Sequence, residues 1–135
     1  MTEFHGLKVL LVEDEGFVAL MIEDMLQDLG CEIVASLARL SEGCEIAASA
    51  EIDLAVLDIN LAGQPSFPIA EILRDRSVPF IFSTGYGESG VPEEFAGSPV
   101  LGKPFSLESL KHTITSALDG VVLREGIRSQ SECRR

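Results

Sequence analysis

The sequence predicts an α/β fold: a doubly wound sheet of five parallel strands with helices on both faces. Short, nearly continuous runs of Val, Ile, Leu and Phe alternate with longer stretches in which apolar residues have helical spacing. The alternation recurs five times and is typical of a parallel sheet joined by right-handed crossovers. The common strand order in such a sheet is 2-1-3-4-5. A length of 135 residues suits one domain of this kind.

The apolar runs predict strands covered on both faces, because their apolar residues do not alternate with polar ones. In chain order, the predicted strands are 7–12, 32–36, 53–59, 79–83 and 99–101. The chain has 7 Phe, 1 Tyr and no Trp, so the core around the sheet is expected to be mostly aliphatic.

The stretches between and after the strands predict helices at 18–29, 40–50, 68–76 and 107–118. Gly30 and Gly120 lie where the first and last of these helices are expected to end, since glycine is common just beyond a helix C-terminus. Segment 85–98 carries four glycines and Pro92. It can hold only a short helix, near 93–96, so we expect the fourth helix of the fold to be short and weak.

Residues 1–118 form the predicted domain. Residues 119–135 are predicted to be a C-terminal tail, which either packs on the domain through its apolar residues or is frayed and disordered. No output domain follows residue 118, so we do not expect this chain to control transcription by itself.

The composition excludes several classes of partner. The net charge is −12, from 10 Lys and Arg against 22 Asp and Glu, which disfavours direct binding to nucleic acid or to an anionic membrane surface. No apolar run approaches the roughly 20 residues that span a bilayer, and no signal peptide precedes the first strand. Three cysteines without a paired motif are typical of reduced thiols in a cytoplasmic protein.

Polar side chains lie at the end of four of the five predicted strands or just after it. They are Glu13, Asp14, Glu15, Asp58, Asn60, Ser83, Thr84 and Lys103. Each has an ordinary structural explanation by itself, as a helix first turn, a turn residue or a surface charge. The carboxyl ends of parallel strands meet at one edge of the sheet, where such folds bind ligands. We therefore expect these side chains to form one site.

Clustered carboxylates with a lysine and a hydroxyl suit one kind of chemistry. Oxygen ligands with open positions favour Mg²⁺, and a carboxylate can act as a nucleophile to form an aspartyl-phosphate. The metal, Lys103 and Thr84 would then neutralise the oxygens of the transferring phosphoryl group. The set predicts Mg²⁺-dependent phosphoryl transfer onto Asp58.

Four motifs carry a family resemblance: LLVEDE at 10–15, LAVLDINLAG at 54–63, FSTG at 82–85 and LGKPF at 101–105. Over about residues 6–118 the chain resembles the receiver domain of two-component response regulators, which has a flavodoxin-like fold. The resemblance implies that Asp58 is the phosphoacceptor, Thr84 the switch hydroxyl and Lys103 the phosphate-binding lysine. The metal ligands that it implies are Glu13, Asp14, Asp58 and the backbone carbonyl of Asn60. It also implies a cis Lys103–Pro104 bond.

The chain departs from the usual receiver pattern in two places. FSTGYG at 82–87 resembles an atypical subgroup with the signature Phe-Ala-Thr-Gly-Gly/Tyr-Tyr, but Ser83 and Gly87 differ from it. Typical receivers have an aromatic residue three positions before the lysine, where this chain has Val100. We therefore expect switching to proceed through reordering of segment 85–98. Tyr86, the only tyrosine of the chain, is either an exposed loop aromatic or a lid over the phosphorylated aspartate.

These features predict a response regulator that receives its phosphoryl group from a histidine kinase or a histidine phosphotransfer protein. Its phosphorylated surface would then bind a downstream protein partner. The alternative is a phosphorelay intermediate or phosphate sink that returns phosphate to histidine proteins.

A flavodoxin-type cofactor protein is disfavoured because acidic residues follow the first strand, where a flavin phosphate would bind. A phosphatase or mutase that forms an aspartyl-phosphate is also disfavoured, because it needs a general acid two residues after the nucleophile, where this chain has Asn60. The chain is thus expected to catalyse only its own phosphorylation and dephosphorylation.

Overall fold

Five parallel strands form the central sheet of the protein in the order β2-β1-β3-β6-β7. The computed structural model describes residues 4–85 and 91–132, and the side chains of these residues as far as 119. The sheet strands are β1 (Lys8–Val12), β2 (Glu32–Leu37), β3 (Leu54–Asp58), β6 (Phe80–Thr84) and β7 (Val100–Gly102). Numbered among themselves, they have the predicted order 2-1-3-4-5, so the doubly wound parallel sheet is confirmed.

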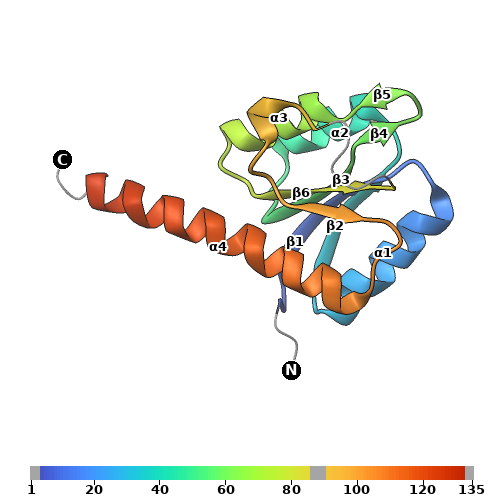
Figure 1. The fold of residues 1–135 in the computed structure, drawn as a ribbon, viewed down its shortest axis with the longest axis horizontal. Helices are drawn as coiled ribbons and strands as arrows, with labels where there is room; N and C mark the ends of the chain where they lie inside the picture. The colour runs from blue at the N-terminus through green and yellow to red at the C-terminus, as the bar shows by residue number, and fades with distance from the viewer. Residues whose placement is uncertain (1–3, 86–90, 133–135) are drawn as a thin grey trace.

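Helices cover both faces of the sheet, as Figure 1 shows. They are α1 (Gly16–Asp28), α2 (Leu40–Ser49), α3 (Phe67–Asp75), the 3-10 turn η1 (Glu93–Phe95) and α4 (Leu107–Glu132). Helices α1 and α4 pack on one face, while α2 and α3 pack on the other. The fourth helix of the fold is only the single turn η1, so the expectation of a short and weak fourth helix is confirmed.

The two faces of the sheet belong to two apolar cores. Along β3, Val56 faces the core with α1 and α4, and Leu57 faces the core with α2 and α3; both are fully buried. Successive side chains of a strand point to opposite faces. Burial on both sides therefore explains why the strand sequences are continuously apolar rather than alternating.

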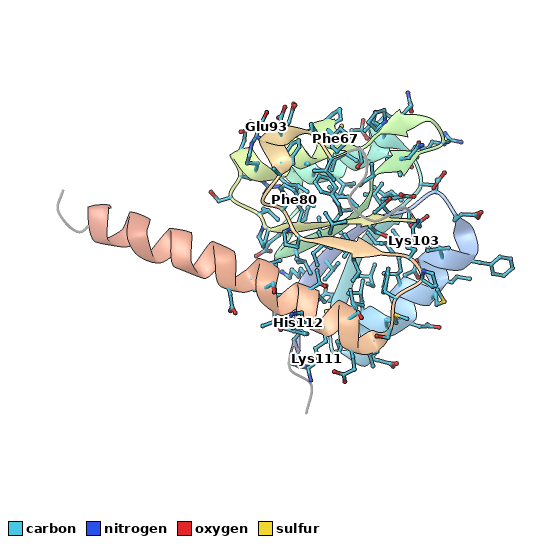
Figure 2. The ribbon with its side chains drawn as sticks, viewed as in Figure 1. Phe67, Phe80, Glu93, Lys103, Lys111 and His112 are labelled. Atoms are coloured by element: carbon cyan, nitrogen blue, oxygen red, sulfur yellow. The ribbon has the colours of Figure 1, made fainter. Side chains whose placement is uncertain are left out.

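Four phenylalanines form a cluster between the sheet and α3. Phe82 of β6 contacts Phe67 and Phe95, with ring centroids 5.6 and 5.7 Å apart. Phe80 also packs edge-on against Phe82 and Phe95, and the guanidinium of Arg74 lies 5.0 Å from the centre of the Phe95 ring. Phe67 and Phe80 are marked in Figure 2. The cluster fixes η1 on the sheet through Phe95.

The structure departs from the sequence-based expectation in two elements. Strands β4 (Asn60–Leu61) and β5 (Gln64–Pro65) form a small antiparallel hairpin that was not predicted. Helix α4 continues through Gly120 to Glu132 and extends beyond the sheet in Figure 1. The predicted helix end at Gly120 is therefore wrong: a glycine inside a helix costs only about 1 kcal/mol relative to alanine and does not force an end. The domain boundary at 118/119 stays a prediction.

None of the helices in the described part of the chain is long and apolar enough to cross a membrane.

Candidate metal and phosphoryl site

Three carboxylates gather at the carboxyl ends of the central strands. Glu13 follows β1, Asp14 follows it, and Asp58 is the last residue of β3. One carboxylate oxygen from each of the three lies within 4.8 Å of the others. Glu13 and Asp58 are 3% and 7% exposed, whereas Asp14 is exposed. The structure thus brings together the three acidic residues that the sequence singled out.

Lys103 supplies the positive charge of the cluster. Its Nζ lies 3.0 Å from Oε1 of Glu13 and 3.5 Å from Oδ2 of Asp58. Burial lowers the pKa of Lys103, but the hydrogen bond to Glu13 and the charges of Glu13 and Asp58 outweigh burial, and the pKa is raised. Lys103 is therefore a permanent ammonium at this edge of the sheet, which Figure 2 shows beyond the end of β7. Its peptide bond to Pro104 is cis, as the resemblance implied.

Asp58 has an unusually high affinity for a proton. Burial raises its pKa first, and the charge of Glu13 and a hydrogen bond with Asp14 add to the effect. The charge of Lys103 lowers the pKa, but the sum raises it to about 7. The cluster therefore carries more negative charge than its single lysine balances, and a cation bound among the carboxylates would restore the ionised form of Asp58.

Backbone amides of the β4–β5 hairpin hold the acidic residues in place. The N–H of Asn60 donates to Oδ1 of Asp58 at 3.3 Å, and the N–H of Ala62 donates to Oδ2 of Asp14 at 3.0 Å. The side chain of Asn60 accepts a 2.7 Å hydrogen bond from the N–H of Gly63 and closes the turn. Ala62 and Gly63 both have positive φ, at 54° and 92°.

The sequence reasoning missed the contribution of this hairpin, because it is made by backbone atoms. The signal that could have revealed it is the Ala62–Gly63 pair, which begins four residues after Asp58 and favours a tight turn.

The donor set fits a hard divalent cation. Three carboxylate oxygens from separate residues converge, and none of the groups in the cluster is a thiol or an imidazole. Oxygen ligands of this kind suit Mg²⁺, which binds through few carboxylates and keeps several waters. Glu13, Asp14 and Asp58 could hold it, and the part of the Asn60 carbonyl in the metal shell stays a prediction.

Thr84 ends β6 at the same edge and is buried. Its backbone carbonyl accepts a 2.7 Å hydrogen bond from the N–H of Lys103, which ties the ends of β6 and β7 together. Its role as the switch hydroxyl remains a prediction. The expected lid, Tyr86, lies outside the described residues.

Comparison with known proteins gives concordant matches. The response regulator receiver domain model matches residues 9–115. The transcriptional regulatory protein PdtaR of Mycobacterium tuberculosis is 28% identical over 115 residues, covering 82% of this chain and 56% of PdtaR. The phyllosphere-induced regulator PhyR of Methylorubrum extorquens is 30% identical over 115 residues, covering 82% of this chain and 43% of PhyR. The chain therefore spans about half the length of these relatives.

Solved structures match along nearly the whole domain. The solution structure of SdrG from Sphingomonas melonis Fr1 has a TM-score of 0.73 and 35% identity, covering 87% of this chain and 97% of SdrG. A second SdrG structure, described as the BeF3-activated conformation, has a TM-score of 0.71 and the same identity, covering 82% of this chain and 95% of that one.

Proposed function

The chain belongs to the response regulator receiver domain family, and on that premise we propose that Asp58 accepts a phosphoryl group in a Mg²⁺-dependent reaction. The observation that carries the proposal is the position of Asp58. It is a buried carboxylate at the end of the central strand β3, beside two further carboxylates and 3.5 Å from the Lys103 ammonium.

The reaction is a transfer between two proteins. A carboxylate oxygen of Asp58 attacks the phosphorus of a phosphohistidine, the O–P bond forms, and the P–N bond to the donor imidazole breaks. Lys103 moves from Glu13 to the phosphoryl oxygens, and the Thr84 hydroxyl donates to another of them. Bound Mg²⁺ would supply charge neutralisation for the carboxylates and the phosphoryl oxygens. Because the chain uses a donor protein and is itself modified, we class it as a phosphoacceptor rather than a conventional enzyme.

We propose that the donor, a histidine kinase or a histidine phosphotransfer protein, contacts α1. Phe17, Leu20 and Met21 are 88%, 59% and 44% exposed. They are three and four residues apart, so they form one apolar strip on the first turns of α1. This helix begins two residues after Asp14, so a protein that reaches Asp58 would cover the strip.

The output of the phosphorylated form is the binding of a downstream protein partner. We propose a cytoplasmic location, because the phosphodonor proteins act there. The alternative role, as a phosphorelay intermediate or phosphate sink, predicts rapid return of the phosphoryl group to a histidine protein.

The test is phosphorylation by a small-molecule phosphodonor followed by intact mass spectrometry. The parent protein should gain one phosphoryl group in Mg²⁺ and none in EDTA, and hydroxylamine should remove it. An Asp14→Ala variant should need much more Mg²⁺, since it loses a charged ligand. Phosphorylation that is independent of metal, or an adduct stable to hydroxylamine, would contradict the proposal.

A further inference from the structure

Ser83 has an unusual position in β6. Its side chain is fully buried, and its Oγ makes no hydrogen bond with any described residue. The strand register pairs Ser83 with Asp58 of β3 on one side and with Leu101 of β7 on the other. Paired residues of neighbouring strands point to the same face of a sheet. Ser83 is therefore the direct strand neighbour of the proposed phosphoacceptor.

Lys103 spans the strand that carries this hydroxyl. Lys103 follows β7, and its ammonium contacts Asp58 on β3 and Glu13 after β1. Strand β6 lies between β7 and β3 in the sheet. The ammonium of Lys103 therefore reaches from β7 past β6 to the end of β3. Ser83 itself is buried from the solvent.

A buried hydroxyl without a partner destabilises the state in which it occurs. An alanine at this position would avoid that cost in the unloaded protein. When the Lys103 ammonium moves to a phosphoryl group, the Asp58 carboxyl group loses its ion-pair partner at 3.5 Å. The Ser83 hydroxyl is a buried donor without a partner on the residue that pairs with Asp58 in the sheet.

We propose that Ser83 is a positioning residue that acts through Asp58: its hydroxyl donates a hydrogen bond to the Asp58 carboxyl group when Asp58 carries a phosphoryl group or its mimic. This inference rests on the proposed function of Asp58. A hydrogen bond that exists only in the loaded site strengthens binding of the mimic without stabilising the unloaded protein.

The chain offers a matched control in Ser66. Its side chain is also fully buried with an unpartnered Oγ. It precedes α3, which packs on the opposite face of the sheet from Ser83. Ser66→Ala and Ser83→Ala therefore remove the same buried hydroxyl from two places, only one of which pairs with Asp58 in the sheet.

The experiment measures two quantities for the parent chain, Ser83→Ala and Ser66→Ala. They are the midpoint of urea unfolding without ligand and the affinity for beryllium fluoride in saturating Mg²⁺, followed by NMR. Ser83→Ala should unfold at the same or a higher urea concentration and bind the mimic about five- to tenfold more weakly, as the loss of one hydrogen bond predicts. Ser66→Ala should bind within about twofold of the parent.

Equal affinity of Ser83→Ala and the parent would overturn the role of Ser83 and leave the proposed function intact. So would an equal loss in both alanine variants, because that loss would reflect buried hydroxyls in general. A parent chain that does not bind the mimic would overturn the proposed function, and the role of Ser83 with it.

Discussion

Lys103 is the residue on which the electrostatics of the cluster depend. It is the single cation within 4 Å of the buried carboxylates of Glu13 and Asp58 among the described residues. The two carboxylates lie close enough for one oxygen of each to be within 4.8 Å of the other, so they repel each other. The Lys103 ammonium therefore stabilises the unloaded protein, in addition to any part it has in the reaction.

Replacing Lys103 with alanine should therefore destabilise the protein in the absence of Mg²⁺. Leaving buried charges without a partner costs about 3–5 kcal/mol. Urea unfolding with and without Mg²⁺ checks this, and the metal should restore more stability to Lys103→Ala than to the parent. Lys8→Ala is the control, because its partner Glu51 is 81% exposed and exposed ion pairs contribute little. Similar losses in both variants would contradict this role of Lys103.

Asp58 makes stability depend on pH in a defined direction. Its pKa in the folded protein is raised to about 7, above the value of about 3.9 for an unfolded chain. Between these two pH values the folded state binds the proton of Asp58 more tightly than the unfolded state does. The contribution of Asp58 to the free energy of unfolding therefore falls as the pH rises from about 4 to about 7. Asp58→Asn should therefore raise the melting temperature at pH 8 without metal, with little change at pH 4. Parallel pH profiles for the two proteins would show that the acid is not perturbed.

At the scale of elements, the expected switch has no aromatic side chain in β7 to work through. Val100 pairs with Phe82 in the sheet, and one of the aromatic contacts of Phe82 comes from Phe95 of η1. In the chain, segment 85–98 follows Thr84 at the site and contains Phe95 of the aromatic cluster. We therefore expect the segment, rather than a single rotamer, to transmit a change at Asp58.

Amide hydrogen exchange should therefore slow mainly in 85–98 when Mg²⁺ and beryllium fluoride are added. Glycines in this segment make reordering inexpensive, and a new contact to Thr84 would hold its start. Mass spectrometry of peptides from this segment and from α1 provides the comparison. Protection in α1 with none in 85–98 would refute the expectation.

The exposed strip on α1 has a prediction of its own. Phe17→Ser should slow phosphorylation by a histidine protein about tenfold or more, as the loss of a buried aromatic contact predicts. Phosphorylation by a small-molecule donor should not change, because Phe17 does not belong to the cluster. Glu71→Ser, on the exposed side of α3, is the matched surface control. Equal slowing with both donors would place the effect in the site rather than in docking.

The sequence predicted the sheet well because each strand is buried on both faces and reads as a continuous apolar run. It also predicted the strand-end cluster, since a parallel sheet brings Glu13, Asp58 and Lys103 to one edge independently of the conformation of the loops. It missed the hairpin, whose two-residue strands carry no periodicity. It also placed the end of α4 too early, because Gly120 signals an end without enforcing one. The pairing of the buried Ser83 hydroxyl with Asp58 depends on strand register, which no local sequence pattern encodes.

At the scale of the whole molecule, one sheet connects the site to two separate cores. Side chains at the carboxyl ends of β3 and β6 belong to the site, and the residues just before them pack against helices on either side. A change in the charge of Asp58 therefore occurs next to residues that pack in both cores. The net charge of −12 adds a general repulsion that bound Mg²⁺ would reduce.

The account as a whole depends on Asp58 being the residue that carries the phosphoryl group. Borohydride reduces an aspartyl-phosphate to homoserine and leaves free carboxylates unchanged, so peptide mapping after phosphorylation and reduction locates the modified residue. The account predicts homoserine at position 58 in the parent protein and at no position in Asp58→Asn. Homoserine at position 14, the corresponding 5-hydroxynorvaline at position 13, or the same yield of homoserine in the variant would contradict it.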